Sequence, residues 1–386
     1  MDKLPTEMLV YIIKNLAPED LRRLRATNKQ MKDLASPTAF SVVKVTNTVR
    51  SMEGLFYLLN ESGICGMIES IEFSESELPA FIESWEECDK DLELFKCVEK
   101  SYASIYLATR LERLFFTFDD MYPWLGDDDD YPSQPVLQYA ILSALASTTS
   151  HPHPSLRSLT IENLLALNNP HWSLMAPLLS GLHSLKIHVL ADDTDCSFDS
   201  DELHEFYDAL SSVVLAACTS LRHLSLSGTR MVGVLPRIDF RMVNCPHLTM
   251  LSLKSMILSW DEDGTFCSAE DFIVRHAGTL ESLKLIGCGM AMLIGDDAPV
   301  RFWSPVWTRF AETLTALTKL EIKFDAPWDP PEDGTDGEVR YFLEDSKYGF
   351  IQHGDVEGKE DDIPAFEALK AVVDSRRENK RGLSSA

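Results

Sequence analysis

Histidine and cysteine pairs are the first places in this sequence to look for metal or catalytic chemistry. His151 and His153 are separated by one proline, and Cys88 and Cys97 are separated by eight residues. Neither pair has the spacing of a structural or catalytic zinc site. The sequence also lacks the G-x-S-x-G of serine hydrolases, a Gly-rich phosphate-binding loop and the H-E-x-x-H of metalloproteases. We therefore expect no catalytic residues, no metal site and no cofactor, and we do not expect an enzyme.

Carboxylates are abundant, and three acidic runs stand out, at residues 126–130, 192–195 and 327–362. The last run carries twelve Asp or Glu against three Lys or Arg. None of the three has the D-x-D-x-D-G…E spacing of a calcium-binding EF-hand loop. They are interpreted either as solvated loops or as the acidic rim of a binding surface.

The chain has the size and composition of a folded protein with two or three domains. It has 386 residues, of which 45% are hydrophobic and 25% charged. No apolar run reaches the ~18 residues needed to span a bilayer, and the first residues do not resemble a signal peptide. We expect a cytoplasmic or nuclear protein, or one found in both compartments, with its 8 Cys reduced.

Charge is distributed unevenly along the chain. Residues 1–50 hold nine Lys or Arg and five Asp or Glu, so this end has a net charge of +4. The remaining residues carry −30, and the whole chain therefore carries −26. The large acidic part disfavours binding to nucleic acid or to anionic membranes, because both need cationic side chains that neutralise phosphate. It favours a basic partner, or it only keeps the chain soluble.

The first 46 residues carry dense helix signals. Pro5 and Pro18 stand at helix starts, each followed by acidic residues that suit a helix N-terminus. The pair at 36–37, Ser then Pro, is expected to stop the third helix, and β-branched residues at 42–45 indicate a strand. Apolar side chains between these signals recur at helical spacing: Leu9, Ile12, Ile13, Leu16, Leu21 and Leu24. So short a segment needs a partner surface, which is either the rest of the chain, capped by these helices, or another protein.

The motif Leu4-Pro5-x-Glu7, the run Asp20-Leu21-x-x-Leu24-Arg25 and the segment from Asn28 to Phe40 agree in identity and spacing with one family. They resemble the F-box in the form common in fungal proteins. The resemblance implies a three-helix domain over residues 1–46 that docks on a Skp-type adaptor of a cullin–RING ubiquitin ligase. Met31 and Phe40 stand where the family often has Trp, which implies a weaker aromatic anchor. The adaptor-facing positions that the resemblance assigns are Leu4, Pro5, Ile12, Leu16, Leu21 and Leu24.

The rest of the chain repeats one spacing, L-x-x-L-x-(L/I/F). It begins at Leu111, Leu156, Leu182, Leu221, Leu248, Leu280 and Leu317, and a weaker relative begins at Ile68. Such a pattern resembles an irregular leucine-rich-repeat solenoid of parallel strands and helices, in which stacked strands bury the leucines. An ordinary α/β domain with Leu-rich buried strands is the alternative. Residues 60–377 are assigned to this body, with a final amphipathic helix from about residue 362, and residues 378–386 to a flexible basic tail.

We consider two functions. The first, which the F-box resemblance implies, is a substrate-recognition subunit of a Skp–cullin–F-box ubiquitin ligase, which binds the adaptor through its N-terminal helices, is tied by the adaptor to a cullin, and binds a protein substrate through the body. The second is a non-catalytic scaffold outside any active ligase. A basic substrate is expected on the strand face opposite the leucines, beside the acidic runs. The candidate residues there are Arg222, His223, Ser225, Thr249, Met250, Ser252, Glu281, Ser282 and Lys284.

Overall fold

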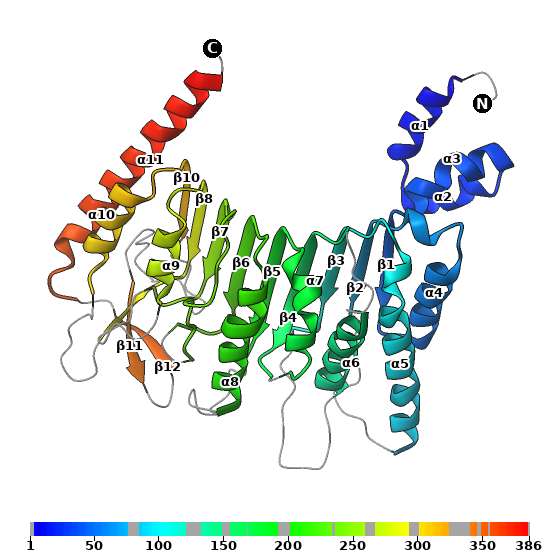
Figure 1. Cartoon of the computed structure of the whole chain (residues 1–386), viewed down its shortest axis with the longest axis horizontal. Coiled ribbons are helices and arrows are strands. Elements are labelled where there is room, and N and C mark those ends of the chain that lie inside the picture. The colour runs from blue at the N-terminus through cyan, green and yellow to red at the C-terminus, as the bar shows by residue number, and fades with distance from the viewer. Residues whose placement is uncertain are drawn as a thin grey trace. The chain divides into compact units, whose positions relative to one another are not determined.

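The computed structural model describes most of the chain and divides it into two compact units, residues 1–161 and 162–386 (Figure 1). The described residues are 4–75, 85–120, 133–148, 155–167, 169–191, 201–233, 236–258, 267–292, 301–323, 340–345, 349–353 and 356–384.

The first unit contains three helices followed by alternating strands and helices. The elements are α1 (Thr6–Lys14), α2 (Pro18–Arg25), α3 (Lys29–Phe40), β1 (Val42–Thr46), α4 (Val49–Asn60), β2 (Ser70–Ser74), α5 (Trp85–Ala103), β3 (Arg113–Thr117) and α6 (Ser133–Ser147). The strand expected after the third helix is β1, and it pairs in parallel with β2. The backbone carbonyl of Ser41 accepts hydrogen bonds from the amides of Glu69 and Ser70, which ties the end of the helical segment to β2.

Strand β4 (Ser158–Leu165) contains the boundary between the units. The second unit continues with α7 (Ala176–Ser180), β5 (Ser184–Leu190), α8 (Asp201–Ala209), β6 (His223–Gly228), β7 (Met250–Lys254), α9 (Ala269–Arg275), β8 (Ser282–Ile286), β9 (Met290–Met292), α10 (Trp303–Thr313), β10 (Lys319–Lys323), β11 (Tyr341–Asp345), β12 (Gly349–His353) and α11 (Asp362–Ser384).

The main sheet has nine strands in the order β1-β2-β3-β4-β5-β6-β7-β8-β10, which is the order of the sequence. The pairings from β1 to β3 and from β5 to β10 are parallel. A smaller sheet of β12, β11 and β9 lies in the second unit. The chain is thus mixed α/β with a parallel sheet, as expected.

The repeated leucines form aligned rows in this sheet. In the second unit one row joins Leu185, Leu224, Leu251, Leu283 and Leu320 on five neighbouring strands. Leu224, Leu251 and Leu283 are buried, which confirms that the motif marks adjacent strands of one sheet. Within each unit the helices lie on one side of the strands, with α4 to α6 in the first and α7 to α9 in the second (Figure 1). The buried leucines are assigned to this covered side, because the residues that alternate with them are more exposed. The opposite side chains are therefore left without a helical cover.

Two features at the C-terminal end differ from the expected loops and tail. Strands β11 and β12 lie inside the acidic run at 327–362, and Asp362 at its end is buried, where it accepts hydrogen bonds from the Ser304 amide and the Tyr341 hydroxyl. Helix α11 continues to Ser384, so residues 378–384 are helical where a flexible tail was expected. Leu369 and Val373 on α11 are buried, as its amphipathic pattern predicts.

Candidate protein-interaction surfaces

The three N-terminal helices share a small apolar core. Ile13, Leu21 and Ala35 are buried in it, one from each helix, and Leu16 and Leu24 pack against them half-buried. The helix starts follow the sequence closely: Pro18 occupies the first turn of α2, and the Asn28 side chain accepts a hydrogen bond from the Met31 amide at 2.9 Å to cap α3. This core fixes the direction of α1.

Helix α3 continues past Pro37 to Phe40, so the stop expected at 36–37 is wrong. A proline removes only one intrahelical donor, and contacts with α2 hold the last turn in place. The Arg25 guanidinium donates to Ser36 Oγ at 2.9 Å and lies 4.2 Å from the centre of the Phe40 ring. Phe40 is thus engaged within the domain.

The outer side of α1 presents an apolar stripe to solvent. Its members are Leu4, Met8, Tyr11 and Ile12, which are 44%, 50%, 68% and 40% exposed, and Pro5 beside them is also exposed. Leu9 and Ile13 occupy the inner side of the same helix and are buried. An apolar helix face left in water in this way marks a protein-binding surface. We call these five residues the α1 stripe.

The structure separates the six predicted adaptor-facing residues into two groups. Leu4, Pro5 and Ile12 belong to the α1 stripe. Leu16 and Leu24 are half-buried, and Leu21 is buried in the core, so Leu21 holds the helices together and does not face outward. The cause is the packing of α2 against α1 and α3, which the linear motif does not reveal.

Sequence reasoning missed Met8 and Tyr11. The signal for Met8 was present, because it lies four residues after Leu4 and four before Ile12, on one face of the helix. Tyr11 completes that face at a spacing of three from Met8. The apolar positions from Leu9 to Leu16 form a stronger helical pattern in the same segment, and they mask this second pattern.

The uncovered side of the sheet in the second unit forms a polar surface, which we call the open sheet face. Its central row joins Lys186, Ser225, Ser252, Lys284 and Glu321 on β5, β6, β7, β8 and β10. The next row includes His223 and Met250, which are exposed neighbours on β6 and β7. The structure therefore brings the predicted residues His223, Ser225, Met250 and Lys284 together.

Arg222 and Glu281 lie at the edge of this face. Each directly precedes its strand, and its carbonyl accepts backbone hydrogen bonds from the next strand in the sheet. The Glu281 carboxylate forms an ion pair with Lys380 of α11 at 2.9 Å. Glu281 is therefore directed toward α11 and is a poor candidate for the open sheet face.

Lysines dominate the charge of the open sheet face. Strands β5 to β10 place Lys186, Lys254, Lys284, Lys319 and Lys323 on its rows. Two carboxylates form ion pairs with these lysines. Glu162 lies 2.7 Å from Lys186, and Glu321 lies 2.9 Å from Lys284 and 3.3 Å from Lys323. Hydrogen bonds from Lys284 and Lys323 lower the pKa of Glu321. The described face is thus net positive, although the chain as a whole is −26.

Most of the acidic rim expected beside this face lies outside the described residues, including 126–130, 192–195 and 327–339. The described carboxylates of the last run are not all free to bind a ligand, since Asp362 is buried at the junction of α10, α11 and β11.

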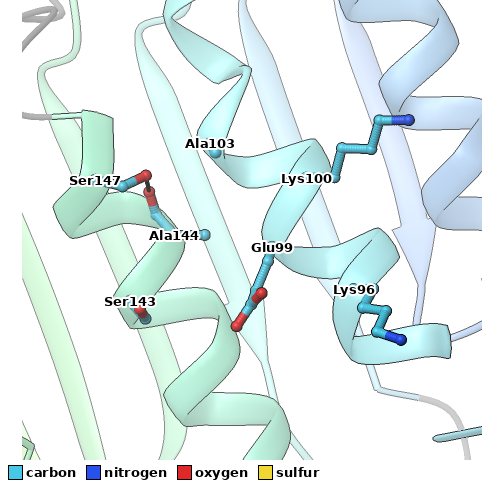
Figure 2. Close-up of a pocket in the computed structure, with 7 residues that line it drawn as sticks. All are labelled: Lys96, Glu99, Lys100, Ala103, Ser143, Ala144 and Ser147. Carbon is cyan, nitrogen blue, oxygen red and sulfur yellow. Dashed lines mark hydrogen bonds between the residues drawn. The ribbon is translucent and has the colours of Figure 1, made fainter. Parts of the chain in front are cut away.

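A groove of about 430 Å³ lies between α5 and α6 in the first unit. Figure 2 shows its lining, with Lys96, Glu99 and Lys100 on α5 and serines on α6. Two of its polar groups have structural partners: Ser147 Oγ donates to the Ala144 carbonyl at 2.6 Å, and the Lys100 ammonium lies 4.0 Å from the centre of the Phe56 ring. The lining contains no nucleophile paired with a base, so the groove offers no catalytic arrangement.

The described residues contain no group of three or more His, Cys, Asp or Glu that could hold a metal ion. His151 and His153 lie outside them, and so does the side chain of Cys88, although Cys97 is described on α5. No helix in the described part of the chain has the length and apolar character needed to cross a membrane.

Comparison with protein families gives one match: a family model described as F-box-like matches residues 1–40. That range contains α1, α2 and α3 and the whole α1 stripe. No curated protein matches the chain.

Proposed function

We propose that this chain, through its F-box-like domain, is the substrate-recognition subunit of a Skp–cullin–F-box ubiquitin ligase. The N-terminal helices bind a Skp-type adaptor, which connects them to a cullin. The rest of the chain, with the parallel strands and aligned leucines of a leucine-rich-repeat-like body, holds a protein substrate. The chain contributes no chemistry of its own in this role, which it performs in the cytoplasm or the nucleus.

The α1 stripe is the observation that carries this proposal. A folded domain that exposes four large apolar side chains on one surface normally buries them against a binding partner. In the described residues, the core of the three helices is complete without them, because Leu9 and Ile13 supply the α1 contribution. The stripe is therefore available for binding, which disfavours a purely internal cap.

Positioning is the contribution of such a subunit to ubiquitin transfer. Holding the substrate lysine beside the ubiquitin donor in the ligase complex makes an intermolecular reaction effectively intramolecular. This raises the rate of transfer without any catalytic group in the receptor.

The test measures binding of a purified Skp-type adaptor to the full chain and to a Tyr11→Ala/Ile12→Ala variant. We expect the double variant to bind at least about tenfold more weakly, because two exposed apolar side chains are lost from the interface. Tyr57→Ala is the matched control, since Tyr57 on α4 is 65% exposed and lies outside the stripe. Thermal unfolding of both variants should match that of the parent chain.

Unchanged adaptor binding in the double variant would contradict the assignment of the stripe. A second measurement separates a ligase subunit from a scaffold: the adaptor-bound chain should also retain a cullin in a pull-down. Adaptor binding with exclusion of cullin favours the scaffold.

A further inference from the structure

We propose that the open sheet face of β5 to β10 binds an extended, acidic segment of a partner protein. Identifying that partner as the substrate rests on the proposed ligase function, whereas the binding itself does not. The proposal replaces the basic substrate expected from the total charge, because the residues on this face have the opposite sign to the chain.

Unpaired cations supply the first argument. Lys254 on β7 and Lys319 on β10 have no carboxylate within ion-pairing distance among the described residues, whereas Lys186, Lys284 and Lys323 each have one. Lys186 and Lys254 both lie close enough to His188 to disfavour its protonation. Burial lowers the pKa of His188, Glu162 opposes that shift, and Lys254 and Lys186 add to it; Nδ1 of His188 lies 3.0 Å from Ser227 Oγ. An added carboxylate would give Lys254 or Lys319 the partner that each lacks among the described residues.

The shape of the central row supplies the second argument. Ser225 and Ser252 stand between Lys186 and Lys284, so two small hydroxyl side chains form a low strip between two long cationic ones. Neither serine side chain has a hydrogen-bond partner among the described residues. Each is free to donate to a carboxylate or a backbone carbonyl laid across the strands.

Strand geometry then fixes the spacing of the acidic residues. Lys186 and Lys284 are three strand spacings apart, which is about 14 Å. An extended chain advances about 3.3 Å per residue, so side chains at positions i and i+4 point the same way and lie about 13 Å apart. A segment with Asp or Glu at i, i+2 and i+4, running across the strands, would reach both end lysines and share them with Glu162 and Glu321.

Charge also selects a protein over a nucleic acid as the occupant. Nucleic acid would bring a continuous polyanion against a chain of net charge −26, whereas a short acidic segment meets only the local lysines.

The experiment measures fluorescence anisotropy of a labelled twelve-residue peptide with Glu at alternate positions, mixed with the full chain. The comparison probes are the same peptide with Gln for Glu, a Lys-rich peptide and a single-stranded oligonucleotide. We expect only the Glu peptide to bind, and we expect its affinity to fall as salt is raised.

A Lys254→Gln/Lys284→Gln variant should bind the Glu peptide at least about tenfold more weakly, because the local cations that complement it are gone. The matched control is Lys370→Gln on α11, an exposed lysine paired with Glu367. Stronger binding of the Lys peptide or the oligonucleotide, or equal effects of the test and control variants, would overturn the proposal.

The α1-stripe variant keeps this test separate from the proposed function. Tyr11→Ala/Ile12→Ala should bind the Glu peptide as the parent does. A parent chain that binds the Glu peptide but no adaptor defeats the ligase assignment alone, and a parent chain that binds the adaptor but not the Glu peptide defeats the acidic-partner assignment alone.

Discussion

At the scale of single residues, the alternation along β7 separates stability from recognition. Leu251 is buried in the leucine row, and its neighbour Met250 points to the open sheet face, 44% exposed. Leu251→Ala should lower the free energy of unfolding by about 2–5 kcal/mol, because it removes buried methyl groups and leaves a cavity. Met250→Ala should change it by less than about 0.5 kcal/mol. Chemical denaturation of both variants checks the contrast, and comparable losses would mean that the leucine row is not the core.

Glu75, which follows β2, gives a second prediction at this scale. Its Oε2 accepts the Asp119 amide at 3.0 Å, but its Oε1 is buried and has no hydrogen-bond partner among the described groups. Burial raises the pKa of Glu75 to about 7. The folded chain therefore binds a proton that the unfolded chain releases at lower pH, and stability falls as pH rises from about 4.5 to about 7.

Glu75→Gln should abolish that loss, because glutamine carries no charge to desolvate. We expect the variant to exceed the parent in free energy of unfolding by about 2–3 kcal/mol at pH 8 and to match it at pH 4. Denaturation curves at the two pH values decide this. A constant difference between variant and parent would assign the effect to packing and not to ionisation.

At the scale of elements, α11 stabilises the end of α10. Arg376 donates from both terminal nitrogens, to the Leu314 carbonyl at 2.8 Å and the Ala311 carbonyl at 2.7 Å. These carbonyls lie at the C-terminal end of α10, where the last carbonyls of a helix lack intrahelical donors; the Leu314 carbonyl also accepts the Leu317 amide at 3.0 Å. Arg376→Met should cost about 1–3 kcal/mol in unfolding free energy. Arg377→Met is the control, since Arg377 only forms an exposed ion pair with Asp374, and equal losses would contradict the capping role.

The elements also show what the sequence could and could not predict. The L-x-x-L-x-L spacing located the strands, because a sheet covered on one face buries every second side chain of each strand. It did not predict β11 and β12, whose acidic and Gly-rich surroundings resemble loops. The F-box motif located α1 to α3, but the path of α3 through Pro37 depends on Arg25, a contact between helices that local rules omit.

At the scale of the whole molecule, the net charge of the chain and the charge of the open sheet face have opposite signs. The chain carries −26, and this total suggested a basic partner. The described sheet face is lysine-rich because strands β5, β7, β8 and β10 each direct at least one lysine to the same side. The net charge of the sequence does not reveal this alignment of lysines, because the alignment depends on strand register.

The two proposed binding surfaces lie in different units, so their ligands should protect different parts of the chain. Adaptor at 100 times its Kd stabilises the state it binds by about 2.7 kcal/mol. Hydrogen exchange should therefore slow in residues 4–40 and remain unchanged in β6 to β8. Uniform slowing in both regions would indicate that the adaptor also contacts the second unit or that the chain opens only as a whole.

Strand β10 pairs with β8 and with no other described strand, and lysines begin and end it. Such charged edges discourage one copy of a sheet from adding to another. A recombinant chain shortened to end after β8 would lose this edge and expose the backbone of Ser282–Ile286, with Leu283 and Leu285 beside it. We expect this shortened chain to self-associate during expression through the exposed edge. The C-terminal region therefore protects the sheet against fibre growth.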